Sequence, residues 1–259
     1  MRIAGSTIKN MTKQMDVVRR YRQAIHRALL FDYDGTLSDF KPHPSLAKPS
    51  SQLLSALQKL CLDAHNTVVI ISGRDQQTLD AWLGHLRLTL IAEHGYAVKQ
   101  HGQVWRTQAI SDLWKKQIKL LMQDSAKSVD GSFVEEKSAA LVWHYRPAQD
   151  QALAIKQAGV LIKKLQKAAQ QHKLSILSGS RAVEVKPSAI HKGAAAQALL
   201  NGHAWDFILA AGDDVTDEDL FKAMPPTAVT VKIGSGNTTA KVTLPNPGVF
   251  LQLLQTLAG

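Results

Sequence analysis

The chain has 259 residues, of which 45% are apolar and 20% charged, and a formal net charge of +10. These proportions are ordinary for a soluble globular protein, and the length allows one large domain or two small ones. The single cysteine, Cys61, excludes an internal disulfide and lies in an apolar helical pattern, which predicts a buried, unreactive thiol. No apolar run approaches the length of a membrane-spanning helix. We therefore expect a cytoplasmic protein without a membrane partner.

Much of the positive charge is concentrated at the start of the chain. Residues 1–27 contain seven Lys or Arg residues and one acidic residue, Asp16. Such a segment is compatible with a transit peptide or a nucleic-acid-binding arm. It has no apolar core of the secretory type, and we favour a basic extension that ends in a helix over residues 15–27. The remaining charge suits an enzyme that attracts an anionic substrate.

The most informative stretch follows directly, where an apolar run ends at Asp32-Tyr33-Asp34-Gly35-Thr36-Leu37. Residues 29–31 predict a buried strand of a parallel sheet. The carboxylates of Asp32 and Asp34, two positions apart, can face one pocket at the carboxyl end of that strand, where open α/β sheets bind ligands. An ordinary turn with solvated aspartates is the alternative interpretation.

Two carboxylates this close together favour a hard cation such as Mg²⁺. With the cation neutralising their repulsion, one carboxylate can attack a phosphoryl group. The other can protonate the leaving alkoxide and later deprotonate the attacking water. The pair therefore predicts phosphoryl-transfer chemistry.

A second strand, residues 67–71, ends at Ser72-Gly73-Arg74. A hydroxyl residue and a glycine before a helix N-terminus form a natural phosphate-binding arrangement. Arg74 is compatible both with substrate binding and with bracing of the loop. His94, which follows the strand at residues 88–92, is expected to pack a loop rather than to bind a metal.

A later strand, residues 206–211, ends in an acidic segment with five carboxylates between Asp213 and Asp219. Such a cluster is costly to hold together without a cation. An acidic helix start, favoured by the helix dipole, is the alternative.

From about residue 105 the pattern changes to an α, β, β, α, β, β order. The helices are expected at 109–128 and 149–171, and the strands at 132–136, 139–144, 174–177 and 182–185. This order predicts a compact inserted α/β domain. The predicted organisation is an extension at 1–27, a core in two parts at 28–105 and 185–259, and the insert at 106–184.

Taken together, these motifs resemble the haloacid dehalogenase superfamily of phosphotransferases. The resemblance implies a Rossmann-like parallel-sheet hydrolase core with an inserted α/β cap domain. It implies Asp32 as the nucleophile, Asp34 as the general acid/base and Lys192 as the cation beside the transferring phosphoryl group. A solvated lysine at a helix start is the alternative for Lys192. The acid at position 34 favours a phosphatase or mutase.

The expected Mg²⁺ site combines groups that follow the strand at 29–31 with groups that follow the strand at 206–211. Asp32, the backbone carbonyl of Asp34 and Asp213 are the predicted ligands, with Asp217 holding the site from nearby and Asp214 close to it.

Within the superfamily, the chain resembles the trehalose-6-phosphate phosphatases. The resemblance rests on residues 32–37, on residues 212–221 and on short patches at 135–137, 144–146 and 179–184. It implies that sugar hydroxyls and phosphate are held by the cap residues Glu135, Lys137, His144, Arg146 and Glu184. Paired acidic and basic side chains provide hydrogen bonds for a polyol, although surface salt bridges are the alternative. Asp39 stands where the family usually has proline.

The resemblance implies Mg²⁺-dependent hydrolysis of trehalose 6-phosphate through an aspartyl-phosphate, in trehalose biosynthesis. A small-molecule sugar phosphate is then the expected partner, without nucleic acid or an obligate protein partner. A phosphatase for sucrose phosphate or another sugar or glycerate phosphate is the first alternative. A basic nucleic-acid-binding protein with an inactive core is a remote alternative, against which the complete set of catalytic residues argues.

Overall fold

The computed structural model describes residues 14–259 except Pro42 and Ser180. The first half of the basic extension, with Arg2, Lys9 and Lys13, therefore lies outside the described residues. Residues 14–23 are helical, and β1 (Arg27–Phe31) follows. The helix ends earlier than predicted because Asp206 accepts hydrogen bonds from the backbone nitrogens of Ile25 and His26, at 3.2 and 2.8 Å.

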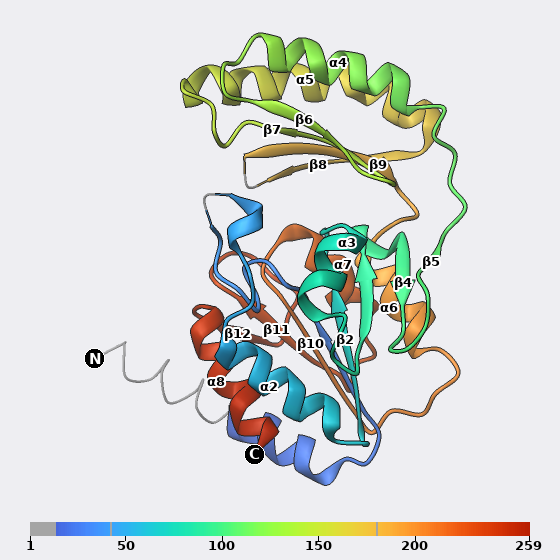
Figure 1. The fold of residues 1–259 in the computed structure, drawn as a ribbon, viewed down its shortest axis with the longest axis vertical. Helices are drawn as coiled ribbons and strands as arrows, with labels where there is room; N and C mark the ends of the chain where they lie inside the picture. The colour runs from blue at the N-terminus through green and yellow to red at the C-terminus, as the bar shows by residue number, and fades with distance from the viewer. Residues whose placement is uncertain (1–13, 42, 180) are drawn as a thin grey trace. The chain divides into compact units, whose positions relative to one another are not determined.

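The chain divides into two compact units (Figure 1). The first, which we call the core unit, consists of the residues up to Arg106 together with His191–Gly259. The second, the cap unit, is Thr107–Ile190. The return to the core unit thus lies six residues beyond the predicted start at 185, since β9 (Ala182–Pro187) continues through that position.

An eight-stranded sheet forms the centre of the core unit, in the order β12-β11-β10-β1-β2-β3-β4-β5. Its remaining strands are β2 (Asn66–Ile71), β3 (Thr89–Ala92), β4 (Ala97–Lys99), β5 (Arg106–Thr107), β10 (Phe207–Gly212), β11 (Val229–Ile233) and β12 (Val242–Leu244). The strands from β12 to β3 are parallel, and β4 is antiparallel to β3. The carboxyl ends of the parallel strands therefore meet at one edge.

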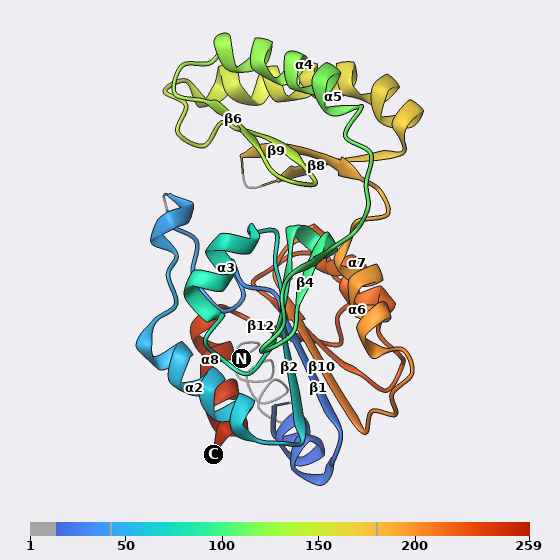
Figure 2. The same ribbon diagram turned by 45° about the vertical axis from the view of Figure 1, so that its right-hand side comes forward.

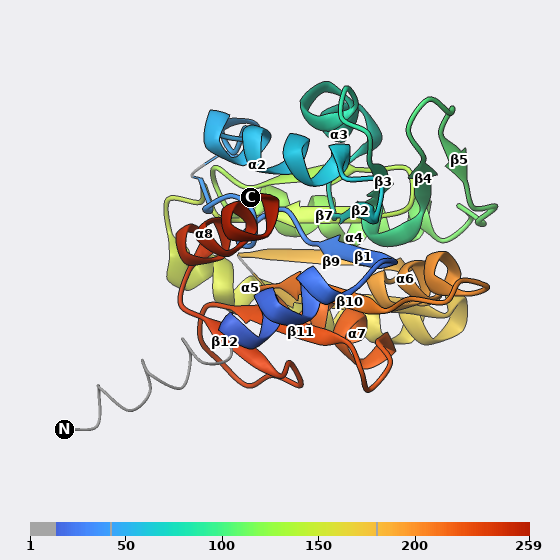
Figure 3. The ribbon, with the colours of Figure 1, turned by 90° about the horizontal axis from the view of Figure 1, so that it is seen from below.

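Helices cover both faces of this sheet, as Figure 3 shows. They are α2 (Ser51–Leu62), α3 (Gln76–Leu83), α6 (Lys192–Leu200), α7 (Val215–Ala223) and α8 (Pro247–Ala258), with short 3₁₀ turns η1 (Pro44–Leu46) and η2 (Glu93–Gly95). In β1, Leu29 and Phe31 pack into the cluster that contains α2, α3 and α8. Ala28 and Leu30 pack on the opposite face with α6 and α7. Because successive side chains of a strand alternate between faces, β1 is apolar throughout.

The cap unit is a separate α/β layer pair (Figure 2). Its antiparallel sheet has the order β6 (Phe133–Glu136), β7 (Leu141–His144), β9, β8 (Leu174–Gly179). The helices α4 (Lys115–Lys127) and α5 (Gln151–His172) pack on one face, around a core that includes Trp143 and Val183. The predicted order of elements is confirmed.

Other element predictions also differ from the structure in detail. The helix expected from 109 begins at Lys115, because residues such as Leu113, which is 83% exposed, have no apolar surface to pack against. The sequence after His94 also predicts a hairpin with arms at 96–98 and 103–105, and the structure has the second arm at Arg106–Thr107 instead. The edge strand β12 was missed, since three residues carry too short a pattern. Among the helices that the structure describes, none has the length and apolarity needed to cross a membrane.

Candidate active site

Three neighbouring strand ends supply the polar groups of the candidate site. Asp32 follows β1, Ser72 follows β2 and Asp213 follows β10, and β1 is paired with both other strands. The backbone nitrogen of Asp32 donates to the carbonyl of Ala211 at 2.9 Å, which continues the pairing of β1 with β10. The parallel pairing therefore brings together groups that are far apart in the sequence.

Lys192 links two buried carboxylates at this edge. Its Nζ lies 2.5 Å from Oδ1 of Asp32 and 2.8 Å from Oδ1 of Asp217. The side chains of Lys192, Asp32 and Asp217 are 2%, 6% and 0% exposed. Lys192 is the first residue of α6, so the helix start places its ammonium beside the end of β1.

Burial and neighbouring charges act strongly on these groups. Burial alone would lower the pKa of Lys192, but the carboxylates of Asp217 and Asp32 outweigh burial and raise it, so the ammonium stays charged. Burial, together with the charges of Asp217 and Asp213, raises the pKa of Asp32 despite the attraction of Lys192. Burial and the charge of Asp217 likewise raise the pKa of Asp213 to about 7. The site thus holds more negative charge than Lys192 neutralises.

This excess is what a divalent cation would relieve. Asp32, Asp213 and Asp217 each offer a carboxylate oxygen, and these oxygens lie within 4.8 Å of one another. Oxygen donors in a compact group suit a hard divalent cation. The residues present therefore fit a metal site.

Two predicted metal-site residues have other contacts. Asp217 stabilises the loop after β10, because its Oδ2 accepts hydrogen bonds from the backbone nitrogens of Asp213 and Asp214, both at 3.0 Å. Asp214 is the N-cap of α7, and its Oδ1 accepts from the nitrogen of Val215 at 2.6 Å. The acidic segment is thus both a helix start and part of a candidate cation site, the two interpretations that the sequence left open.

The turn after Asp32 fits closely against Asp213. Gly35 has a φ of 81°, and a methyl group on it would lie 2.2 Å from Oδ2 of Asp213. Only glycine combines this conformation with this approach. Thr36 Oγ1 lies 3.5 Å from Oδ1 of Asp213.

Sequence reasoning missed Lys232, in β11. Its side chain is buried, and its ammonium donates to the backbone carbonyl of Asp213. A lysine inside the apolar strand Val229–Ile233 was the available signal, because a buried lysine needs an acceptor.

Arg74 contacts Asp34 in this structure. Its Nε and Nη2 donate to the two carboxylate oxygens of Asp34, at 2.7 and 2.6 Å, and Nη2 also donates to the carbonyl of Pro44 at 3.0 Å. The guanidinium lies 4.4 Å from the ring centroid of Trp82. Of the two roles left open by the sequence, these contacts support bracing.

The predicted phosphate-binding loop lies next to this pair. Ser72 is 1% exposed, and its hydroxyl accepts a hydrogen bond from the backbone nitrogen of Arg74 at 3.2 Å. Gly73 follows, and α3 begins after its N-cap residue, Asp75. Oδ1 of Asp75 accepts a hydrogen bond from the backbone nitrogen of Thr78 at 2.8 Å. The loop is therefore a capped strand-to-helix turn, as predicted.

The predicted sugar-binding residues belong to the cap unit. Glu135 lies opposite Val142, and Val142 lies opposite Glu184, so the two carboxylates share one cross-strand row. That row is on the face away from α4 and α5, because Trp143 and Val183 point into the cap core. Glu136, by contrast, pairs with Lys119 of α4 at 2.7 Å.

The same face of the cap sheet carries a stacked histidine. Nε2 of His144 lies 2.7 Å from Oε2 of Glu135, and the His144 ring stacks on Phe133 with ring centroids 4.8 Å apart. Lys137 begins the turn between β6 and β7, where its backbone nitrogen donates to the carbonyl of Ala140 at 2.9 Å. Arg146, which is half-buried, follows β7.

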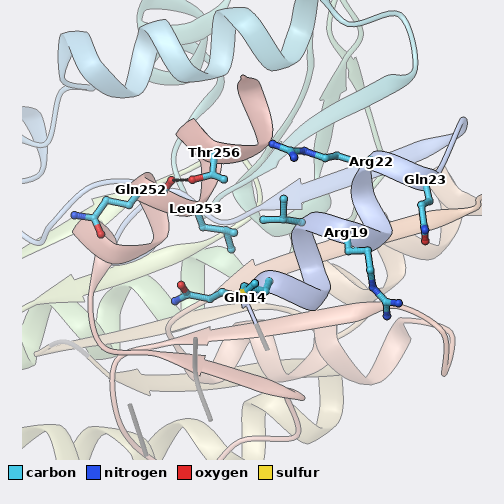
Figure 4. Close-up of a pocket in the computed structure, with 9 residues that line it drawn as sticks. Gln14, Arg19, Arg22, Gln23, Gln252, Leu253 and Thr256 are labelled. Atoms are coloured by element: carbon cyan, nitrogen blue, oxygen red, sulfur yellow. Dashed lines mark hydrogen bonds between the residues drawn. The ribbon is translucent and has the colours of Figure 1, made fainter. Parts of the chain in front are cut away.

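The core unit also has a groove that lies away from these groups. Figure 4 shows it between the helix of residues 14–23 and α8, with Arg19, Arg22, Gln252 and Leu253 among the residues that line it. Its volume is about 770 Å³, and it shares no residue with the acidic cluster. None of the described residues that line it is an aspartate or a glutamate.

The fold and the strand-end carboxylates define a haloacid dehalogenase-type hydrolase core with an α/β cap. The structure is similar to that of the C-terminal domain of Candida albicans trehalose-6-phosphate phosphatase, with a TM-score of 0.89 and 31% identity, over 95% of this chain and 96% of that one. The profile of the trehalose-phosphatase family matches residues 30–246. The chain belongs to the trehalose-phosphatase family, which confirms the resemblance and fold class inferred from the sequence.

Curated relatives contain the matched region as part of longer chains. The bifunctional trehalose-6-phosphate synthase/phosphatase of Thermoproteus tenax is 43% identical over 85% of this chain and 30% of its own length. The trehalose-phosphatase of Saccharomyces cerevisiae is 34% identical over 94% of this chain and 32% of its own. The chain thus spans about a third of the length of these relatives.

Proposed function

We propose that the protein hydrolyses trehalose 6-phosphate to trehalose and inorganic phosphate, as a cytoplasmic enzyme of trehalose biosynthesis. The observation that carries the proposal is Asp32 at the end of β1, held 2.5 Å from Lys192 beside Asp213 and Asp217. Membership of the trehalose-phosphatase family supports the substrate. The proposal needs a small sugar phosphate and neither nucleic acid nor a protein partner.

The core residues divide the chemistry between them. A carboxylate oxygen of Asp32 attacks phosphorus and forms an aspartyl-phosphate while the bond to the sugar oxygen breaks. Asp34 donates a proton to that oxygen as trehalose leaves, and then takes a proton from the water that cleaves the aspartyl-phosphate. Lys192 holds Asp32 in position and offers its ammonium to the phosphoryl oxygens.

We propose Mg²⁺ as the cofactor, bound by Asp32, Asp213 and the backbone carbonyl of Asp34, with Asp217 holding the Asp213–Asp214 loop. When bound, the cation would balance the excess negative charge of the carboxylates and of the substrate phosphate. Ser72 and Gly73, at the start of a capped turn, are proposed to bind the phosphate through the hydroxyl and backbone N–H groups.

The face of the cap sheet that carries Glu135 and Glu184 is proposed to bind the disaccharide. Glu135 and Glu184 in one row can accept hydrogen bonds from sugar hydroxyls, and His144, Lys137 and Arg146 can donate them. The exposed ring of Phe133 beside His144 adds an apolar surface of the kind on which a sugar ring packs.

The test is phosphate release from a panel of substrates. Trehalose 6-phosphate, sucrose 6-phosphate, glucose 6-phosphate and a phosphoglycerate are each assayed with Mg²⁺, with excess chelator, and after Mg²⁺ is restored. We expect the highest kcat/KM for trehalose 6-phosphate and activity that disappears with chelator and returns with Mg²⁺. Preference for another substrate contradicts the substrate assignment, and full activity in chelator contradicts the metal.

A further inference from the structure

The turn η2, which follows β3, has an unusual backbone. Glu93 and His94 are successive non-glycine residues with φ values of 46° and 60°, and both are buried. L-amino acids seldom adopt this left-handed region because the Cβ atom crowds the backbone. Such a conformation persists where the surrounding structure imposes it, most often near functional sites.

The turn lies next to the proposed phosphate-binding loop. The backbone nitrogen of His94 donates to the carbonyl of Ser72 at 2.9 Å, and that of Glu93 donates to the carbonyl of Arg74 at 2.9 Å. These two carbonyls flank Gly73. Two backbone hydrogen bonds therefore hold the loop, one on each side of its glycine.

The imidazole of His94 packs on Gly73 itself. A methyl group on Gly73 would lie 2.7 Å from Nε2 of His94 and 2.8 Å from its Cε1. The ring thus occupies the space that any side chain at position 73 would need. Gly73 is required here by the approach of His94, and its own φ is unremarkable.

The same turn also touches the helix that carries Lys192. Gly95 has a φ of 121°, and a methyl group on it would lie 2.9 Å from Cβ of Ala195, in the first turn of α6. Three successive residues therefore connect the Ser72–Arg74 loop on one side with the start of α6 on the other.

We propose that the Glu93–Gly95 turn sets the spacing between the phosphate-binding loop and Lys192, and that His94 is the positioning residue of this device. This inference rests on the proposed phosphatase function. His94 acts through Gly73 and does not itself contact the substrate. It goes beyond the loop-packing role expected from the sequence, because it predicts an effect on phosphate binding.

The first test separates the ring of His94 from its backbone. His94→Asn removes the imidazole but tolerates a left-handed φ, and His94→Gly removes both the ring and the steric cost. We expect both variants to raise KM and the inhibition constant for inorganic phosphate about tenfold, with trehalose 6-phosphate and with a small aryl phosphate alike. His85→Asn, at an exposed histidine of the core unit, is the matched control and should change neither constant.

Equal effects on the two substrates are the signature of a defect at the phosphate end. Unchanged phosphate inhibition in folded His94 variants would overturn the proposal. If the wild-type protein cleaves the aryl phosphate but not trehalose 6-phosphate, the substrate assignment fails, whereas the role of His94 is still decided with the aryl phosphate.

A second test exchanges side-chain size between positions 73 and 94. Gly73→Ala should lower kcat/KM at least about tenfold, because the methyl group displaces either the loop or the ring. Adding His94→Gly opens the space, so the double variant should be more active than Gly73→Ala alone. Losses that multiply in the double variant would show that the two residues act independently and would overturn the proposal.

Discussion

Arg74 holds Asp34 through two parallel hydrogen bonds of 2.7 and 2.6 Å, with the guanidinium lying over Trp82. Bidentate pairing fixes the carboxylate in orientation as well as in position. Asp34 is the proposed general acid/base, so its alignment affects each proton transfer. On this proposal, Arg74 would act on the chemistry through Asp34.

Replacing Arg74 with Lys keeps the charge but removes the planar pair of donors. We expect kcat to fall on the order of tenfold for both trehalose 6-phosphate and an aryl phosphate. Asp34→Asn with Arg74→Lys should be no slower than Asp34→Asn alone, since the two residues act as one unit. Steady-state kinetics of the four proteins checks this, and multiplying losses would instead indicate a separate substrate contact for Arg74.

Asp32→Asn should abolish turnover, because an amide of nearly the same shape is a poor nucleophile. Asp34→Asn should lower the rate by about 10²–10⁴, the usual contribution of a general acid/base. Rapid-quench measurement of the phosphorylated protein should detect the intermediate in wild type and none in Asp32→Asn. Substantial activity in well-folded Asp32→Asn would rule out Asp32 as the nucleophile.

Lys192 is expected to stabilise the fold as well as the reaction. Lys192→Met leaves Asp32 and Asp217 buried without their cation, and removing one partner of a buried ion pair costs about 3–5 kcal/mol. Urea unfolding in chelator should show this loss. Adding Asp217→Asn should restore part of the stability, and an unchanged midpoint for Lys192→Met would contradict the buried pairing.

We expect substrate choice to depend on the face of the cap sheet that carries Glu135 and Glu184. Glu184→Ala should lower kcat/KM for trehalose 6-phosphate far more than for a small aryl phosphate. The reason is that only the disaccharide has hydroxyl groups that can form a hydrogen bond with the Glu184 carboxylate. Glu136→Ala is the matched control, since Glu136 lies on the same sheet but pairs with Lys119 of α4. Equal losses on both substrates would place Glu184 in the structure of the cap.

Alkaline pH should destabilise the protein through Cys61. Burial raises the pKa of this thiol from 9.0 to about 12, so the folded state holds the proton more tightly than the unfolded state does. Its contribution to stability is complete below pH 9 and declines as the pH rises toward 12. We expect a loss of about 1 kcal/mol between pH 8 and 10, measured by urea unfolding.

Cys61→Ala should reduce that loss, and a thiol reagent at pH 8 should modify the wild-type protein only after unfolding. Rapid modification of the folded protein would contradict the buried thiol. An identical pH dependence in Cys61→Ala would assign the alkaline loss to other groups.

The polar residues that follow the core strands were predictable from the sequence, because the pattern that marks them is local. An apolar strand of a parallel sheet followed by a polar turn is visible within ten residues, as at Asp32, Ser72 and Asp213. The helix start that follows Arg74 was also predictable, because the capping side chain of Asp75 marks it. The start of α4, with Trp114 at its N-cap and no capping hydrogen bond from it, was misplaced.

Only the tertiary structure decided which of these groups meet. Lys192 pairs with Asp32 across 160 positions, and Arg74 pairs with Asp34 across 40. The contact of His94 with Gly73 likewise depends on two loops that the pairing of β2 with β3 brings together. Periodicity and capping report the local conformation of the backbone, whereas such pairs follow from strand order and register, which form only when the whole sheet assembles.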